Sequence, residues 1–323
     1  EERTQVQGLA DLEGWNTGSG PGALTRDQGE AASLGRLRLW AAGLFTDRFQ
    51  AFALGRLEGG QATGKQETET ELEQGYLRYA FGESRRTVLQ AGKLTLPYGN
   101  FAHRYFSSAN PLIGSPMNYE ISYPLGIQIN GAAGRFDYMA ALLDGPLWKQ
   151  EYDSEPKSAP RPALAAGFTP FTGLRVGGYA SQGPYLSRIS EDWLFPGDGL
   201  NDFGERTYGL DLQFSVRHFE LNGELTQASL EVPYEGETRG RLWYVEPKYT
   251  FSPRWYLAAR WERGNRPDSV WIWSTRWRAE RERIHDLEAG VGFRINPRFL
   301  VKASYRSAIN GGAPGPGSPE GRA

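Results

Sequence analysis

Hydrophobic and polar residues alternate along much of the chain with a period of two. The clearest example is residues 285–305, HDLEAGVGFRINPRFLVKASY, where apolar side chains occupy every second position on both sides of Asn296-Pro297-Arg298. Because neighbouring side chains of a β-strand point to opposite faces, each arm of this stretch has one apolar and one charged face. The stretch therefore predicts two antiparallel strands joined by a tight turn.

The same alternation recurs through the chain, and the connections between the predicted strands alternate in length. Every second connection is a turn of about two to four residues, as in adjacent antiparallel strands. The long polar connections are expected at residues 16–32, 59–70, 97–124, 144–161, 183–206, 231–239 and 264–282. A water-soluble sandwich explains one hairpin but not this segregation of the loops, which is typical of outer-membrane barrels with short periplasmic turns and long extracellular loops.

The fold class predicted is therefore all-β, a transmembrane antiparallel up-and-down barrel of about 16 strands, wide enough for an aqueous channel. About fifteen strands can be read from the alternation, whereas single-chain bacterial barrels have even strand numbers. Either one strand escapes the pattern or the chain stops before its closing strand, and the second interpretation fits every other connection. We expect one barrel domain over residues 1–309, followed by a Gly/Pro-rich tail or loop at 310–323.

Composition agrees with strands and turns, since the chain has 41 Gly, 20 Pro and 10 Trp. The sequence has no apolar run near the ~20 residues of a transmembrane helix. A mean hydropathy of -0.55 is compatible with a barrel, because only one face of each strand meets lipid. The net charge of -2 gives no general attraction to nucleic acid.

Two further features limit the chemistry and the location of the chain. The absence of cysteine excludes disulfides, thiolate metal sites, covalent c-type haem and cysteine nucleophiles. A start at Glu1 without a leader fits either a processed, exported protein or a chain given without its leader. We expect an outer-membrane location reached through the periplasm.

Four segments resemble a family of bacterial outer-membrane porins related to the phosphate-selective porin O and P group. They are LQAGKLTLPYGNF (89–101), FDYMAALLDGP (136–146), GLRVGGYASQGPYL (173–186) and LEAGVGFRINPRFLVKASY (287–305). The resemblance implies passive diffusion of small solutes through a barrel, often a trimer, with a constriction near mid-height. Family members continue into a final strand that ends in an aromatic residue, which this chain does not. The family's lysine-rich phosphate ladder is not evident, because the strands carry only Lys93, Lys248 and Lys302, so phosphate selectivity is not expected.

Charged residues on the polar side of the strands are expected to line the lumen. They are Arg36, Arg38, Arg56 and Arg78 in the early strands, and Asp211, Glu220, Glu224, Glu246, Arg260, Glu262, Asp286, Glu288 and Lys302 in the later ones. Basic and acidic groups on opposing walls would set a transverse field that orients dipolar solutes. The alternative is that these charges pair across neighbouring strands and contribute little to selection.

Two long connections carry candidate contacts. Segment 97–124 is longer and richer in aromatic residues than is expected of a connecting loop without a function. Folded into the lumen, it would place His103, Arg104, Tyr105 and Asn118 at a constriction; otherwise it forms an external cap. The tryptophans of 264–282 (Trp271, Trp273, Trp277) would contact lipopolysaccharide, a partner or a neighbouring subunit, or simply extend the aromatic girdle.

The sequence thus predicts a porin for small hydrophilic solutes and not an enzyme, with outer-membrane lipid around it and no metal or cofactor. A second hypothesis is a barrel scaffold that sheathes or docks a protein such as a periplasmic cytochrome. A third is an outer-membrane lipase, assembled from His103 with Ser107 or Ser108. The content of the lumen discriminates the first two: an inward-folded 97–124 with an open water path favours a porin, and an empty, wide lumen favours a scaffold.

Overall fold

The computed structural model describes residues 3–16, 31–60, 68–95, 99–116, 123–145, 159–186, 188–272 and 276–308. In these ranges the chain forms one antiparallel sheet of fifteen strands, each paired with its neighbours in sequence order. The strands are β1 (Thr4–Asn16), β2 (Ala31–Leu44), β3 (Phe49–Gly60), β4 (Glu69–Phe81), β5 (Thr87–Lys93), β6 (Leu125–Ala133), β7 (Phe136–Leu143), β8 (Arg161–Phe171), β9 (Leu174–Pro184), β10 (Gly204–Val216), β11 (Phe219–Val232), β12 (Gly236–Thr250), β13 (Trp255–Ile272), β14 (Arg276–Asn296) and β15 (Phe299–Ala308). This confirms the all-β, up-and-down architecture predicted from the sequence.

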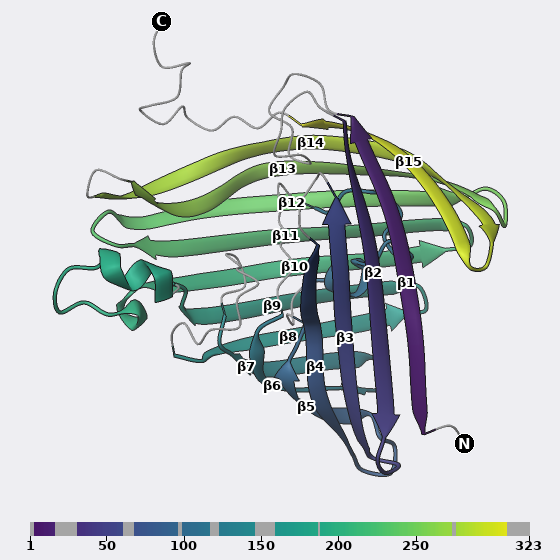
Figure 1. Ribbon diagram of the computed structural model, residues 1–323, viewed down its shortest axis with the longest axis horizontal. Helices are drawn as coiled ribbons and strands as arrows, with labels where there is room; N and C mark the ends of the chain where they lie inside the picture. The colour runs from purple at the N-terminus through teal and green to yellow at the C-terminus, as the bar shows by residue number, and fades with distance from the viewer. Residues whose placement is uncertain are drawn as a thin grey trace, which may run out of the picture.

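The sheet curves round, so that β1–β4 pass in front of the strands at its middle in Figure 1. The described residues also form three short 3-10 helices: η2 (Ala102–Arg104), η3 (Arg188–Trp193) and η4 (Leu200–Asp202). Within the described residues β1 pairs only with β2 and β15 only with β14, so the sheet is not closed by a strand pair. No helix of the described chain is both long and apolar enough to cross a membrane.

One end of the sheet is made of tight turns whose sequences set their geometry. At the β14–β15 turn, the Asn296 side-chain oxygen accepts hydrogen bonds from the backbone N–H of Arg298 (2.8 Å) and Phe299 (3.1 Å). The Thr46 hydroxyl oxygen accepts from the N–H of Phe49 (3.0 Å) in the same way at the β2–β3 turn. Such Asx- and Ser/Thr-type turns reverse the chain in few residues, which confirms the tight turn predicted at 296–298.

Two of the connections expected to be long loops are hairpins, which corrects the sequence analysis. Strands β11 and β12 stay paired up to Val232 and Gly236, and β13 and β14 up to Ile272 and Arg276. The register of the second pair sets Arg266 opposite Glu282, so residues of opposite charge are paired across the ladder. The sequence indicated a loop because polar residues follow one another directly there, as at Asn265 and Arg266, so that the alternation fails as a signal.

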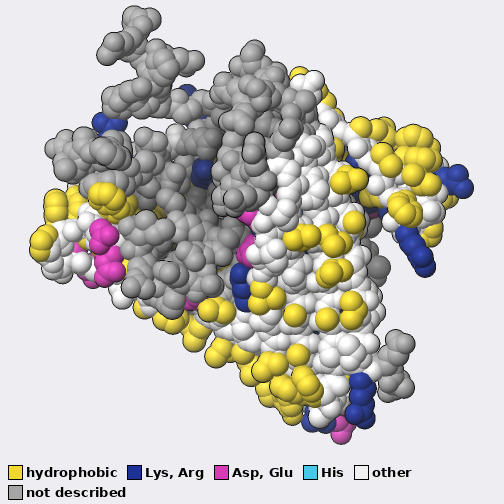
Figure 2. Space-filling view, in the orientation of Figure 1, with side chains coloured by type: hydrophobic (Ala, Val, Ile, Leu, Met, Phe, Trp, Pro, Cys, Tyr) yellow, Lys and Arg dark blue, Asp and Glu magenta, His cyan; other side chains and the backbone are white. Residues whose placement is uncertain are grey.

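The outer face of the sheet carries the apolar residues of the alternating pattern. Leu39, Ile127, Leu210, Leu257 and Val301 are all exposed on this face, Leu210 by 63%. Figure 2 shows hydrophobic side chains spread over the surface of β1–β4, with Lys and Arg gathered at the turns. An exposed apolar face of this extent is what a barrel presents to lipid.

Leu210→Arg is expected to destabilise the folded protein in a bilayer by about 2–4 kcal/mol, because it places a charge on the apolar face at the middle of β10. The matched control is Gln213→Arg, on the opposite face of the same strand. Urea titration of folding into liposomes checks both variants. Equal losses in the two would contradict the assignment of the faces.

Candidate pore lumen and its inner segment

Residues 99–116, here called the inner segment, lie against the polar face of the sheet. Asn100 begins the attachment and is fully buried. Its side-chain N–H groups donate to the carbonyls of Leu212 (2.9 Å) and Gly223 (3.3 Å), and its side-chain oxygen accepts from the Tyr244 hydroxyl (2.8 Å). The first residues of the segment are therefore fixed to β10, β11 and β12.

Arg104 and Phe101 extend this attachment on the same side of the lumen. Arg104 donates to the carboxylate of Glu246 (2.5 Å). Phe101, also fully buried, packs in a cluster with Leu143, Ala163 and Tyr179 from β7, β8 and β9. The beginning of the inner segment is thus held by apolar packing as well as by hydrogen bonds.

The second half of the inner segment is held by β13, β14 and β15. Arg260 donates to the Gly114 carbonyl (2.7 Å) and to the Asn110 side-chain oxygen (3.1 Å). The Glu288 carboxylate accepts from the Gly114 backbone N–H (3.0 Å). Lys302 donates to the carbonyls of Ser107 (3.0 Å), Asn110 (3.1 Å) and Leu112 (2.8 Å). A single lysine on the last strand therefore satisfies three backbone acceptors of the segment.

The same segment also reaches the first two strands. Arg38 on β2 donates to the Tyr105 hydroxyl (3.1 Å), and the Ser107 hydroxyl donates to Asp11 on β1. Ser107 therefore contacts β1 through its side chain and Lys302 of β15 through its carbonyl. The inner segment links the two end strands, which do not pair with each other in the described residues.

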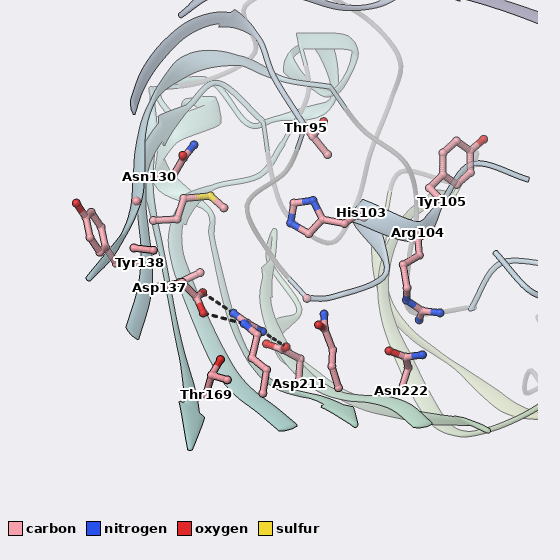
Figure 3. A pocket seen from close by; sticks show the side chains of 18 of the residues that line it. Thr95, His103, Arg104, Tyr105, Asn130, Asp137, Tyr138, Thr169, Asp211 and Asn222 are labelled. Carbon is pink, nitrogen blue, oxygen red and sulfur yellow. Dashed lines mark hydrogen bonds and ion pairs between the residues drawn. The ribbon is translucent and has the colours of Figure 1, made fainter. Parts of the chain in front are cut away.

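The residues expected at a constriction are placed as follows. Arg104 and Tyr105 are half-buried between the segment and the walls, while His103 is more exposed. In Figure 3 the His103 ring points into the cavity beside the segment. Asn118 lies outside the described residues.

The charged residues expected in the lumen lie on the face of the sheet that the inner segment covers. Arg38, Arg56, Asp211, Glu224, Glu246, Arg260, Glu262, Asp286 and Glu288 are each at most 8% exposed. Arg36, Arg78, Glu220 and Lys302 are half-buried on the same face. These positions are the ones that alternate with the lipid-facing apolar residues.

Arginines of the early strands have carboxylate partners on the same wall. Arg38 donates to Glu73 (2.8 and 3.1 Å), and Arg36 to Glu58 (2.5 Å). Arg56 lies 2.8 Å from Glu71 and 3.4 Å from Glu73. Because opposite charges alternate along β1–β5, this wall is not a purely basic surface. Pairing of the charges across neighbouring strands describes it better than a field between opposing walls does.

A β-bulge explains why Glu71 and Glu73 were missed by the sequence analysis. The register between β3 and β4 jumps between Leu54 and Gly55, where Gln74 and then Leu72 are the partners. One extra residue in β4 reverses the facing of everything before it, so that Glu73 and Gln74 both turn to the polar side. Strict alternation counted back from Gln74 places Glu73 on the lipid face.

A cavity of about 1150 Å³ remains between the first half of the inner segment and the walls formed by β4–β11. In it Arg175 is paired with Asp137 (2.7 Å) and Asp211 (2.5 Å). Figure 3 shows Asp137 and Asp211 on the wall of the cavity, with dashed lines for these contacts. Arg175 and Asp137 were missed in the sequence, although Arg175 follows the alternation of β9 and could have been found by it.

The surroundings of His103 give it a low affinity for protons. Displacement of water by the surrounding protein, and then the positive charge of Arg175, lower the pKa of His103 from its ordinary value, although Asp211 and Asp137 act in the opposite sense. The pKa of His103 therefore lies below the ordinary histidine value of about 6.5, and the side chain gains its positive charge at a more acidic pH than a free histidine does.

Acidification is expected to shift the channel toward anions through this histidine. As the pH falls below the ordinary histidine value of about 6.5, protonation of His103 adds one positive charge to the cavity, which attracts anions and repels cations. The check is the reversal potential across a bilayer under a salt gradient, compared between the native chain and His103→Asn. The carboxylates titrate in both proteins, so identical pH profiles would rule out a contribution of His103.

Comparisons with known proteins bear on the fold. No protein-family model and no curated relative matches the sequence. Among solved structures, the chain is similar to an anion-selective porin from Comamonas acidovorans, with 10% identity, a TM-score of 0.64, and 95% of this chain and 89% of that chain covered. The chain has the fold of an outer-membrane porin.

Two further porin-fold structures show the same likeness over nearly the whole chain. OmpF of Salmonella typhi, solved in complex with daunomycin, has 11% identity and a TM-score of 0.61, with 94% of this chain and 89% of that chain covered. The trimer form of OmpT, an outer membrane protein of Vibrio cholerae, has 13% identity and a TM-score of 0.60, with 96% and 90% covered. This near-complete coverage confirms the outer-membrane barrel architecture predicted from the alternation.

Proposed function

We propose that the chain is an outer-membrane porin through which small hydrophilic solutes diffuse passively, without a chemical step. The observation that carries the proposal is the inner segment, which is fixed across the polar face of the sheet and leaves a cavity of about 1150 Å³ beside it. A sheet that is apolar outside and polar inside supports a water-filled path, because solutes then meet hydrogen-bonding groups throughout.

The inner segment also weighs against the alternatives. A scaffold that sheathes another protein needs an empty lumen, whereas here Lys302 and Arg260 hold the chain's own residues in it. A lipase needs His103 beside a serine, but in the described chain no hydrogen bond links His103 to Ser107 or Ser108, and the Ser107 hydroxyl donates to Asp11.

Kinship with the phosphate-selective porin O and P group is part of the proposal, but phosphate selectivity is not. Lys93 pairs with Glu71 and Lys248 with Glu220, while Lys302 is occupied by three carbonyls of the inner segment. A phosphate ladder needs lysines that face the water without partners. The anion selectivity that is stated for the Comamonas porin is likewise not proposed for this chain.

The remaining parts of the proposal concern the surroundings of the barrel. We assign residues 1–309 to one barrel domain in the bacterial outer membrane, with lipid and lipopolysaccharide around it and export through the periplasm. A homotrimer is proposed because the trimer form of Vibrio cholerae OmpT has the same fold. A periplasmic or extracellular protein partner is not required for diffusion.

Liposome swelling tests the proposed function. Vesicles that contain the folded protein should swell in isotonic arabinose or glycine and remain unswollen in dextran, because the segment narrows the path for large solutes. Heat-unfolded protein in the same vesicles is the control. Vesicles with folded protein that swell no faster than this control would overturn the proposal.

A further inference from the structure

The cavity beside the inner segment has a wall of uncharged amides on β5 and β6. Gln90 and Gln128 are register partners across these strands, and Asn130 lies two residues further along β6. Gln128 (3.1 Å) and Asn130 (2.9 Å) both donate to the side-chain oxygen of Gln90. We call these three residues the amide row; all three line the cavity, and Figure 3 shows Asn130 on its wall.

The amide row keeps unused hydrogen-bonding capacity. An amide side chain has two N–H donors and one oxygen with two acceptor positions. The Gln128 side-chain oxygen is buried and has no hydrogen-bond partner among the described residues. The Asn130 side-chain oxygen likewise has no hydrogen-bond partner among them. The row thus has both donors and acceptors left for a ligand, which is the combination that a hydroxyl group can meet from either side.

Aromatic and polar neighbours continue this surface. Tyr76 on β4 is joined to Gln90 by a side-chain hydrogen bond, and its ring stacks on Phe52 with centroids 5.0 Å apart. On β10 and β11, Gln213 and Asn222 also line the cavity. Uncharged polar groups therefore lie on more than one wall of the cavity.

The charged groups at the same cavity are largely neutralised by one another. Arg175 is held between Asp137 and Asp211. Arg104 is paired with Glu246, and Glu220 with Lys248. Arg86 also lines the cavity, as an exposed cation outside these pairs. The amide row itself is uncharged, so a neutral hydroxylated molecule matches its free groups better than a simple ion does.

We infer that this cavity is a binding subsite for neutral saccharides, with the amide row as its main contact, an inference that rests on the proposed pore function. The sugar hydroxyls donate to the side-chain oxygen of Asn130 and accept hydrogen bonds from the remaining amide N–H groups of the row. The subsite thus slows the diffusion of saccharides through the channel more than it slows the diffusion of simple ions.

The test is block of potassium current through single channels in a planar bilayer by raffinose, a neutral trisaccharide. Raffinose should reduce the current in a saturable manner, and a polyethylene glycol of matched size, which lacks most of the hydroxyls, should not. The double variant Gln90→Leu/Asn130→Leu should bind raffinose about threefold to tenfold more weakly for each net hydrogen bond lost. Gln50→Leu, the same change on the lumen face outside the cavity, should leave the block unchanged.

Each other outcome is decisive. If the channels conduct but raffinose does not block them, or blocks them no better than the polyethylene glycol, the saccharide subsite is overturned. The proposed pore function is not affected by that result. Equal block in the native chain and the double variant overturns the role of the amide row, and Asn130→Leu alone provides this comparison if the double variant does not fold. A native protein that does not conduct at all overturns the proposed function itself.

Discussion

Arg260→Met is expected to lower the free energy of unfolding by about 3–5 kcal/mol, the usual cost of removing one partner of a buried ion pair. Arg260 is fully buried and donates twice to Glu246 (2.9 and 2.5 Å). Its loss leaves Glu246 with Arg104 alone and removes the donor to the Gly114 carbonyl. The measurement is urea unfolding of the folded barrel from liposomes.

The matched control is Arg239→Met, which breaks the exposed Arg239–Glu237 pair at 2.9 Å and should cause no measurable loss. Arg260→Met leaves the buried cluster with one excess negative charge. Removing a carboxylate should restore part of the stability, so Arg260→Met/Glu246→Leu is expected to be more stable than Arg260→Met alone. If the single and double variants unfold alike, the cost does not arise from an unpaired charge in the lumen.

Replacement of residues 100–115 by a Gly-Ser chain of equal length should raise the single-channel conductance roughly twofold or more, because the width of the narrowest part controls passage. The replacement removes the side-chain anchors at Asn100, Arg104 and Ser107, so the segment keeps only its backbone contacts and is held less firmly across the lumen. Conductance steps in a planar bilayer measure the effect, and the raffinose block described above should weaken in the same variant because one wall of the cavity is lost.

The matched control is a Gly-Ser replacement of equal length at residues 188–203, which contain η3 and η4 between β9 and β10. This connection packs near the end of β11 that lies away from the tight turns, through Leu194, Leu200 and Phe203 on a cluster around Leu230. Its loss should leave the conductance nearly unchanged. An unchanged conductance after replacement of the inner segment, in protein that still folds, would show that the segment does not restrict the channel.

The fold could be predicted from the sequence because lipid and water act on successive residues of each strand. Leu210 is 63% exposed on the outer face and Asp211 is 7% exposed on the inner one, and this contrast repeats along the sheet. The prediction was wrong for 231–239 and 264–282, where polar residues that follow one another directly removed the contrast. Residues such as Arg266 and Glu282 then indicated a loop although they are paired in β13 and β14.

The candidate site could be predicted only as far as the alternation extends. The alternation placed Arg38 and Glu288 on the lumen face of the sheet. It did not find Glu73, the buried partner of Arg38, because the bulge in β4 shifts the alternation there. The attachment of the inner segment depends on contacts between residues far apart in sequence, such as Asn100 with Gly223. Local periodicity carries no information about such pairs, so the segment could be nominated by its length and aromatic content but not oriented.

The central claim is that the chain forms an open aqueous channel narrowed, but not closed, by the inner segment. Single-channel recording of the purified protein in a planar bilayer tests it most directly. An open channel predicts discrete, stable conductance steps, because a cavity of about 1150 Å³ remains beside the segment. Folded protein that inserts into the bilayer and shows no steps would contradict it, since the inner segment would then be a plug.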